Sequence, residues 1–120
     1  FAARLGAIEM QGLQGELDRA LARLSGLGRE DDTNEMRAER ARVRARLYEA
    51  NGQPDRAKQV LVNVLRGEDA PTGRTQGRVH YDLGTIYRDT YENFTLAAAH
   101  FDTAATSLPS GHDKARRPTQ

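Results

Sequence analysis

The sequence contains no cysteine, no run of sheet-forming residues and no long apolar segment. Without cysteine, neither a disulfide framework nor a thiolate zinc site can form, and the redox compartment stays open. No apolar run approaches the roughly 18 residues that a membrane-spanning helix needs, and no signal-peptide pattern opens the chain. We therefore expect a soluble domain that does not insert into a membrane.

The chain also lacks a strong excess of charge, since 18 basic and 17 acidic residues leave a net charge of +1. Arginine nevertheless outnumbers lysine 16 to 2, and five arginines fall within ten residues, at positions 37, 40, 42, 44 and 46. Clustered cations can mark a nucleic-acid surface because they release counterions from phosphate. Glu35, Glu39 and Glu49 interleave with these arginines, which favours a solvated helix face over a nucleic-acid partner.

What the sequence does contain is helix-forming residues. Seventeen alanines accompany arginine, glutamate and leucine, a composition typical of short packed helices, and 120 residues are enough for one domain. The first residue is Phe1 rather than methionine, so we expect a piece of a longer protein whose targeting signals lie elsewhere. The preference for arginine over lysine suggests a GC-rich genome and a bacterial source, and the compartment is left unknown.

An internal repeat organises the chain. Residues 15–20 (GELDRA) match residues 52–57 (GQPDRA) at a shift of 52 − 15 = 37 residues, and Leu24 and Leu27 map to Leu61 and Val64 at the same shift. A third copy follows at a shift of 97 − 57 = 40 residues, where Ala97, Phe101 and Ala104 replace Ala57, Leu61 and Val64. A period in this range is typical of stacked helix pairs.

The third copy has the clearest signature. Residues 80–87 (HYDLGTIY) precede Ala97, Phe101, Ala104 and Pro109. This order of Leu-Gly, aromatic residue, alanine, phenylalanine and a closing proline resembles the tetratricopeptide repeat family. The match is weaker in the second copy, where Arg44 and Ala45 stand in place of Leu-Gly, and weakest in the first.

This resemblance implies an all-α fold, a right-handed superhelix (solenoid) of about three antiparallel helix hairpins. The copies would span residues 1–27, 34–66 and 74–108 of a repeat domain at 1–109, and residues 110–120 would form a polar tail. We expect the second helix of each copy to start after Gly15, after Gly52 and after the Glu92-Asn93 turn. The first helices of copies two and three should cover residues 33–50, with Thr33 or Asn34 as the cap, and residues 75–90.

Residue patterns for catalysis are absent. His80, His100 and His112 have no partner ligand three or four residues away, so no metal site is predicted. No nucleophile–histidine–acid set and no glycine-rich phosphate loop can be recognised, and the glycines at positions 12 to 28 lack a preceding strand. We therefore expect no enzyme activity and no cofactor.

The candidate site follows from the family geometry. We expect Tyr48, Tyr87 and Phe101 to pack in the core at signature positions, whereas Tyr81 lies on another side of its helix. In tetratricopeptide repeats this side lines the concave groove. The resemblance thus implies a peptide-binding groove made of Glu39, Arg42, Arg46, Glu49, Arg78, Tyr81, Thr85, Arg88 and Asp89.

Four arginines in such a groove would suit a partner protein or peptide with acidic groups, because guanidinium binds carboxylate in a bidentate fork. The competing interpretation is that Arg42 pairs with Glu39 or Glu49, and Arg88 with Glu92, as surface ion pairs of little energetic value. The predicted function is a protein-interaction module. The alternative is a structural spacer, a self-association element forming a homo-oligomer, or a regulatory domain of a larger envelope or signalling protein.

Overall fold

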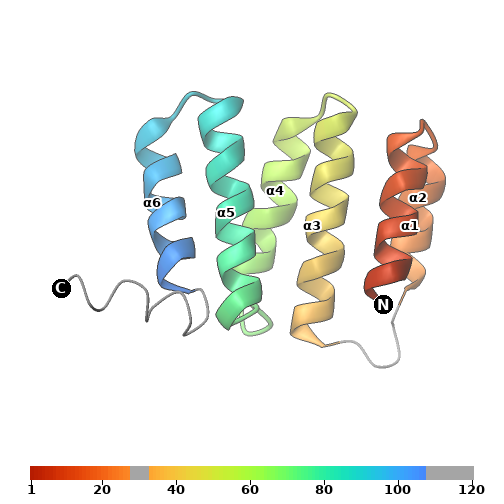
Figure 1. Ribbon diagram of the computed structural model, residues 1–120, viewed down its shortest axis with the longest axis horizontal. Helices are drawn as coiled ribbons and strands as arrows, with labels where there is room; N and C mark the ends of the chain where they lie inside the picture. Colours follow the sequence, from red (N-terminus) through yellow and green to blue (C-terminus); the bar gives the residue numbers. More distant parts are fainter. Residues whose placement is uncertain (28–32, 108–120) are drawn as a thin grey trace.

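The computed structural model describes residues 1–27 and 33–107, and within them the chain forms six α-helices and no strand (Figure 1). The prediction of a compact all-α chain is confirmed. Pro109 and the expected polar tail at 110–120 lie outside the described residues, as does most of the link before the third helix. The helices are α1 (Ala2–Leu13), α2 (Leu17–Gly26), α3 (Asn34–Ala50), α4 (Pro54–Leu65), α5 (Gly73–Asp89) and α6 (Phe94–Thr106).

Consecutive helices pack in three antiparallel pairs, α1 with α2, α3 with α4 and α5 with α6, each closed by a short turn (Figure 1). The first two turns contain Gly15 and Gly52 at φ of +97° and +75°, a left-handed conformation that glycine adopts without steric cost. In the third turn Glu92 takes the corresponding conformation at φ 51°. The repeated Gly-x-x-Asp-Arg-Ala pattern is therefore a turn followed by the start of a second helix.

Local residues fix where the helices begin. The Thr33 side chain accepts a hydrogen bond of 3.0 Å from the Met36 backbone N–H, which confirms Thr33 as the cap of α3. Pro54 is the first residue of α4, where its missing N–H is not needed. The Asn93 side chain caps α6 by accepting from the Leu96 N–H. Helix α5 begins at Gly73, two residues before the predicted start.

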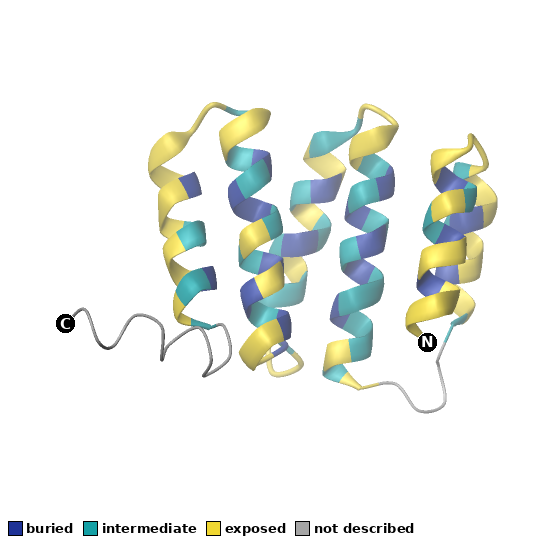
Figure 2. Cartoon of the chain, in the orientation of Figure 1, coloured by how far each residue is buried: buried dark blue, intermediate teal, exposed yellow. Residues whose placement is uncertain are grey.

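The core consists of two apolar clusters that run between neighbouring pairs (Figure 2). Each combines leucines with small residues, because alanine and glycine let helices approach closely. A Cβ atom added to Gly84 would lie 2.7 Å from the Phe101 ring, so α5 and α6 cross at this glycine. One cluster contains Leu5, Ile8, Ala20, Leu24, Val43 and Leu47, and the other contains Ala38, Ala45, Ala57, Leu61, Val79, Leu83 and Ile86.

Tyr48 and Tyr87 pack against the second cluster, as the sequence predicts. Phe101 is only half-buried and lies at the edge of α5 and α6. None of the helices in the described ranges is both long enough and apolar enough to cross a bilayer.

Candidate interaction groove

The first helices of the three pairs, α1, α3 and α5, follow one another along one side of the molecule (Figure 1). A cavity of about 420 Å³ opens between α1 and α3 and reaches α5 through Arg78. Four of its lining residues are charged and four are apolar, an arrangement that can accept an apolar side chain and orient a charged one. The lining residues are Phe1, Ala2, Leu5, Gly6, Glu9, Glu39, Val43, Arg46 and Arg78.

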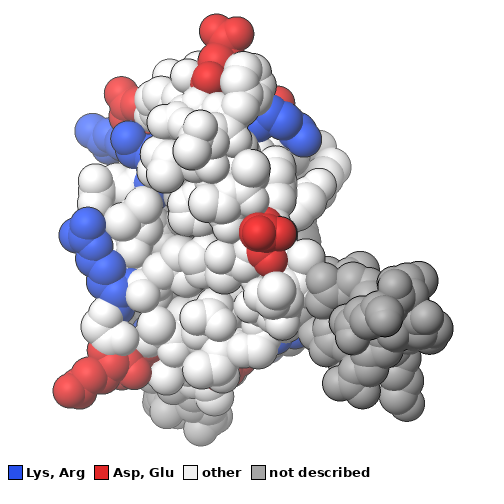
Figure 3. Space-filling view, turned by 90° about the vertical axis from the view of Figure 1, so that its left-hand side faces the viewer, with Lys and Arg blue, Asp and Glu red and all other residues white. Residues whose placement is uncertain are grey.

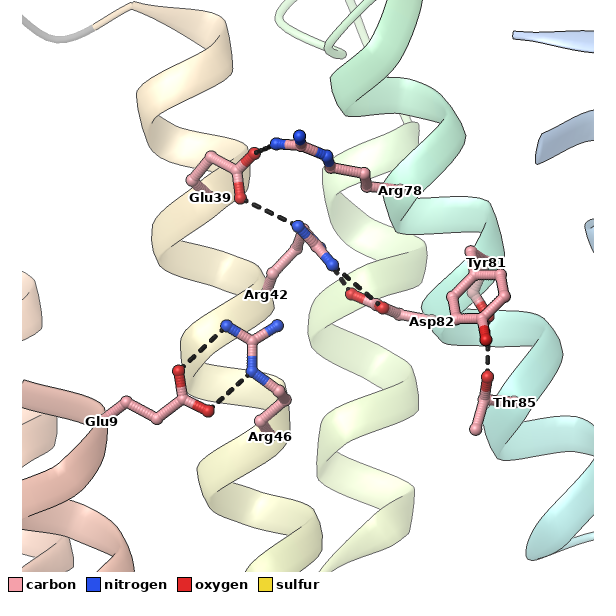
Figure 4. A network of polar contacts seen from close by, with 8 residues as sticks. All are labelled: Glu9, Glu39, Arg42, Arg46, Arg78, Tyr81, Asp82 and Thr85. Atoms are coloured by element: carbon pink, nitrogen blue, oxygen red, sulfur yellow. Dashed lines mark hydrogen bonds and ion pairs between the residues drawn. The ribbon is translucent and has the colours of Figure 1, made fainter. Parts of the chain in front are cut away.

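Beside this cavity, Arg42 joins α3 to α5 (Figure 4). Its Nε lies 2.6 Å from Asp82 Oδ2, its Nη2 lies 3.2 Å from Asp82 Oδ1, and its Nη1 lies 3.1 Å from Glu39 Oε1. The side chains of Arg42 and Asp82 are each only 16% exposed. Burial opposes the charged guanidinium, but the hydrogen bond and charge of Asp82, with Glu39, outweigh it and raise the pKa of Arg42.

Two further ion pairs extend this network along the groove (Figure 4). Arg78 donates from Nη1 to Glu39 Oε2 at 3.1 Å, and Arg46 forms a bidentate pair with Glu9 at 2.8 and 3.0 Å. The structure thus brings together four of the predicted groove residues, Glu39, Arg42, Arg46 and Arg78. It also pairs each of these arginines with a carboxylate of the chain itself.

Sequence analysis missed Glu9 and Asp82, although the repeat spacing was a usable signal for both. Arg46 follows Glu9 by 37 residues, and Asp82 follows Arg42 by 40 residues. These separations equal the two shifts of the repeat, so each pair occupies nearly equivalent positions on successive first helices. Opposite charges one period apart therefore indicate ion pairs between neighbouring hairpins.

The other predicted residues on α5 form a separate patch near α6. Tyr81 is 56% exposed, and its ring centre lies 5.5 Å from that of Phe101. Thr85 donates from Oγ1 to the Tyr81 carbonyl within the helix. Arg88 lies 5.5 Å from the centre of the Phe101 ring and pairs with Asp89 at 2.8 Å, rather than with Glu92 as expected. The hydrogen bond between them raises the pKa of Arg88 and lowers that of Asp89.

Glu49, on the last turn of α3, completes the predicted set. Burial raises its pKa, as do the carboxylates of Asp82 and Asp89, whereas Arg46 lowers it. The nine predicted residues have a net charge of 4 − 3 = +1, and adding Glu9 and Asp82 changes this to 1 − 2 = −1. The wall as a whole is therefore not a cationic surface, and an acidic partner would compete with internal carboxylates for the arginines.

The structure also brings together two histidines that lie 20 residues apart in the sequence. His80 on α5 and His100 on α6 approach to 2.9 Å between their Nδ1 atoms, so one ring donates and the other accepts. Tyr87 stacks on His100 with ring centres 5.4 Å apart. No third histidine or carboxylate joins them as a potential metal ligand in the described ranges. Burial lowers the pKa of both histidines, and for His80 the charge of His100 adds to the effect.

We predict that acidification weakens the fold through this pair. Both histidines have folded-state pKa values below the ordinary 6.5, so the unfolded chain binds protons first. The contribution of the neutral histidines to the free energy of unfolding is complete above the pKa that they have in the unfolded chain. It is lost as the pH falls from there through their lower folded-state pKa values. Urea unfolding at several pH values from about 7.5 to 5.5 should show a falling free energy, with a smaller slope in His100→Gln. An unchanged slope in that variant would contradict the prediction.

Comparisons with protein-family models, with curated proteins and with solved structures give no match.

Proposed function

We propose that this chain is a tetratricopeptide-like domain whose three hairpins stack as a right-handed superhelix and bind a partner polypeptide. Three features support this proposal. The pairs of helices share turn and crossing residues at a period of 37 to 40 residues. The first helices of the three pairs, α1, α3 and α5, lie one after another along one wall. That wall contains a cavity of about 420 Å³.

The observation that carries the binding proposal is the mixed lining of this cavity. Leu5 and Val43 contribute apolar surface, which suits one aliphatic or aromatic side chain of a partner. Arg78 is 44% exposed and donates to Glu39 through only one of its nitrogens, so its remaining donors are available for a carboxylate. We therefore expect a peptide that places an apolar residue in the cavity and an acidic residue next to it on Arg78.

Filling the cavity tests this assignment. A Cβ on Gly6 would have open space around it, so Gly6→Leu should enter the cavity without disturbing the packing of α1. Peptides selected from a random display library on the wild-type domain should lose affinity by at least about tenfold on Gly6→Leu, measured by fluorescence polarisation. Arg78→Gln should weaken only those peptides that contain an acidic residue.

Gly26→Leu is the matched control, because Gly26 is also helical, has equally open surroundings and lies on α2 away from the cavity. It should bind the selected peptides like the wild type. Equal affinity of Gly6→Leu and Gly26→Leu for every selected peptide would show that the groove is not the binding site.

The alternative function, self-association between copies, is favoured by the outer face of α6. Phe94 and Leu96 are 64% and 41% exposed there, and Asp102 is the only charged residue among residues 94–106. Figure 3 faces this end of the stack and shows few charged groups over it. A weight-average mass in light scattering that rises with concentration, and that Phe94→Ser abolishes, would support association; a constant monomer mass would exclude it.

A further inference from the structure

The five clustered arginines of the sequence separate onto two sides of α3. At about 100° per residue, Arg37, Arg40 and Arg44 share one side, and Arg42 and Arg46 lie roughly opposite. The second group belongs to the groove described above. The first group lines a different cavity of about 470 Å³ between α3, α4 and the link to α5.

This second cavity, here called the arginine cavity, has a strongly basic lining. Four guanidinium groups and one carboxylate, that of Asp69, lie among its described residues. Its apolar floor includes Val60 and Val64 from α4. The full lining is Asn34, Arg37, Ala38, Arg40, Ala41, Arg44, Val60, Asn63, Val64, Arg66, Asp69 and Pro71.

Two of the four arginines have contacts with other parts of the chain. Arg37 bonds to Asn34 and lies 3.8 Å from Asp69, and Arg40 donates to the Leu27 carbonyl at 2.9 Å; both have further interactions. Arg44 and Arg66 make no ion pair and no side-chain hydrogen bond with any described residue.

The position of Arg44 is unusual within the repeat. Helices α3 and α5 both have 17 residues and start 73 − 34 = 39 residues apart, so Arg44 corresponds to Leu83. Leu83 is only 1% exposed and belongs to the apolar core. At the position of this leucine the second copy has Arg44, a half-buried cation. The packing of a helix pair does not require a charge there, because burying a charge costs free energy.

We propose that the arginine cavity binds a small phosphate-bearing anion, with Arg44 and Arg66 holding its phosphate oxygens. Guanidinium groups match phosphate in a bidentate geometry, and a di- or polyphosphate can engage several of them at once. Asn63 accepts from Gln59 through its Oδ1, which leaves its amide nitrogen available to donate to the same anion. This site is distinct from the peptide groove and does not depend on the function proposed for it.

Isothermal titration calorimetry with inorganic pyrophosphate tests the proposal on the whole chain. The wild type should bind it saturably, and Arg44→Leu combined with Arg66→Gln should weaken binding by at least about tenfold. Leucine at position 44 restores the residue found at the equivalent Leu83, so this variant should fold. If circular dichroism shows that it does not, Arg66→Glu alone, at an exposed position, gives the same test.

The matched control removes the same charge elsewhere. Arg19→Gln with Arg23→Gln takes away two exposed arginines of α2, which bond to Glu16 and Gln11, and it should bind pyrophosphate like the wild type. The proposal is overturned if the wild type shows no saturable binding or if the control loses as much affinity as the cavity variant. Equally tight binding of citrate would overturn the assignment to phosphate.

Discussion

Replacing Asp82 with alanine should lower the free energy of unfolding by about 2 to 3 kcal/mol, measured by urea denaturation. The side chains of Arg42 and Asp82 are 16% exposed, and two hydrogen bonds join them. Removing the carboxylate leaves a largely buried guanidinium with only Glu39 as its partner. The cost comes mainly from this uncompensated charge rather than from the lost ion pair itself.

A pair of control variants separates these two causes. Arg42→Leu with Asp82→Leu removes both charges and should recover most of the stability, because apolar residues of similar size often replace a buried ion pair without loss. Asp89→Ala breaks the exposed pair with Arg88 and should leave the unfolding midpoint unchanged. If Asp82→Ala were as mild as Asp89→Ala, the network would contribute nothing to folding.

Leu61→Ala should lower the free energy of unfolding by about 3 kcal/mol. Leu61 is fully buried and contributes to the cluster that joins α3 and α4 to α5. Truncation removes buried apolar surface and leaves a cavity that the neighbouring helices fill only in part. Such a loss is a large part of the 5–15 kcal/mol typical of a domain.

Leu13→Ala is the matched control, since Leu13 is 49% exposed at the end of α1. The same chemical change should have little effect on its urea midpoint. Equal effects of the two substitutions would mean that the apolar contacts between neighbouring pairs are not what holds the stack together.

The sequence predicts the helices well where their boundaries depend on local chemistry. Thr33 and Pro54 define helix starts through capping and through a fixed φ, and the glycine turns follow from the left-handed conformation. The Leu-Gly pattern indicates the repeat, and its glycine, Gly84, lies where α5 meets the Phe101 ring of α6. Each of these effects acts over a few residues and can be recognised without knowledge of the tertiary packing.

The candidate site is less predictable because its contacts join residues far apart in the chain. The face of α3 with Arg42 and Arg46 was implied by the resemblance to the tetratricopeptide family, but the identity of their partners depends on how the hairpins align. Alignment by the repeat period would have found Glu9 and Asp82. The approach of His80 to His100 has no such signal, since the two residues are not one repeat period apart and their contact depends on how α6 packs against α5.

The ion pairs of the groove have one more consequence. Arg46–Glu9 joins the first hairpin to the second, and Arg42–Asp82 and Arg78–Glu39 join the second to the third. All three lie on the wall of first helices. Dissolved salt screens the more exposed pairs Arg46–Glu9 and Arg78–Glu39 more than the largely buried Arg42–Asp82 pair, whereas the apolar clusters are insensitive to this screening. Ionic strength should therefore loosen one side of the stack selectively and change its curvature, so that the width of the groove responds to the salt concentration of the solution.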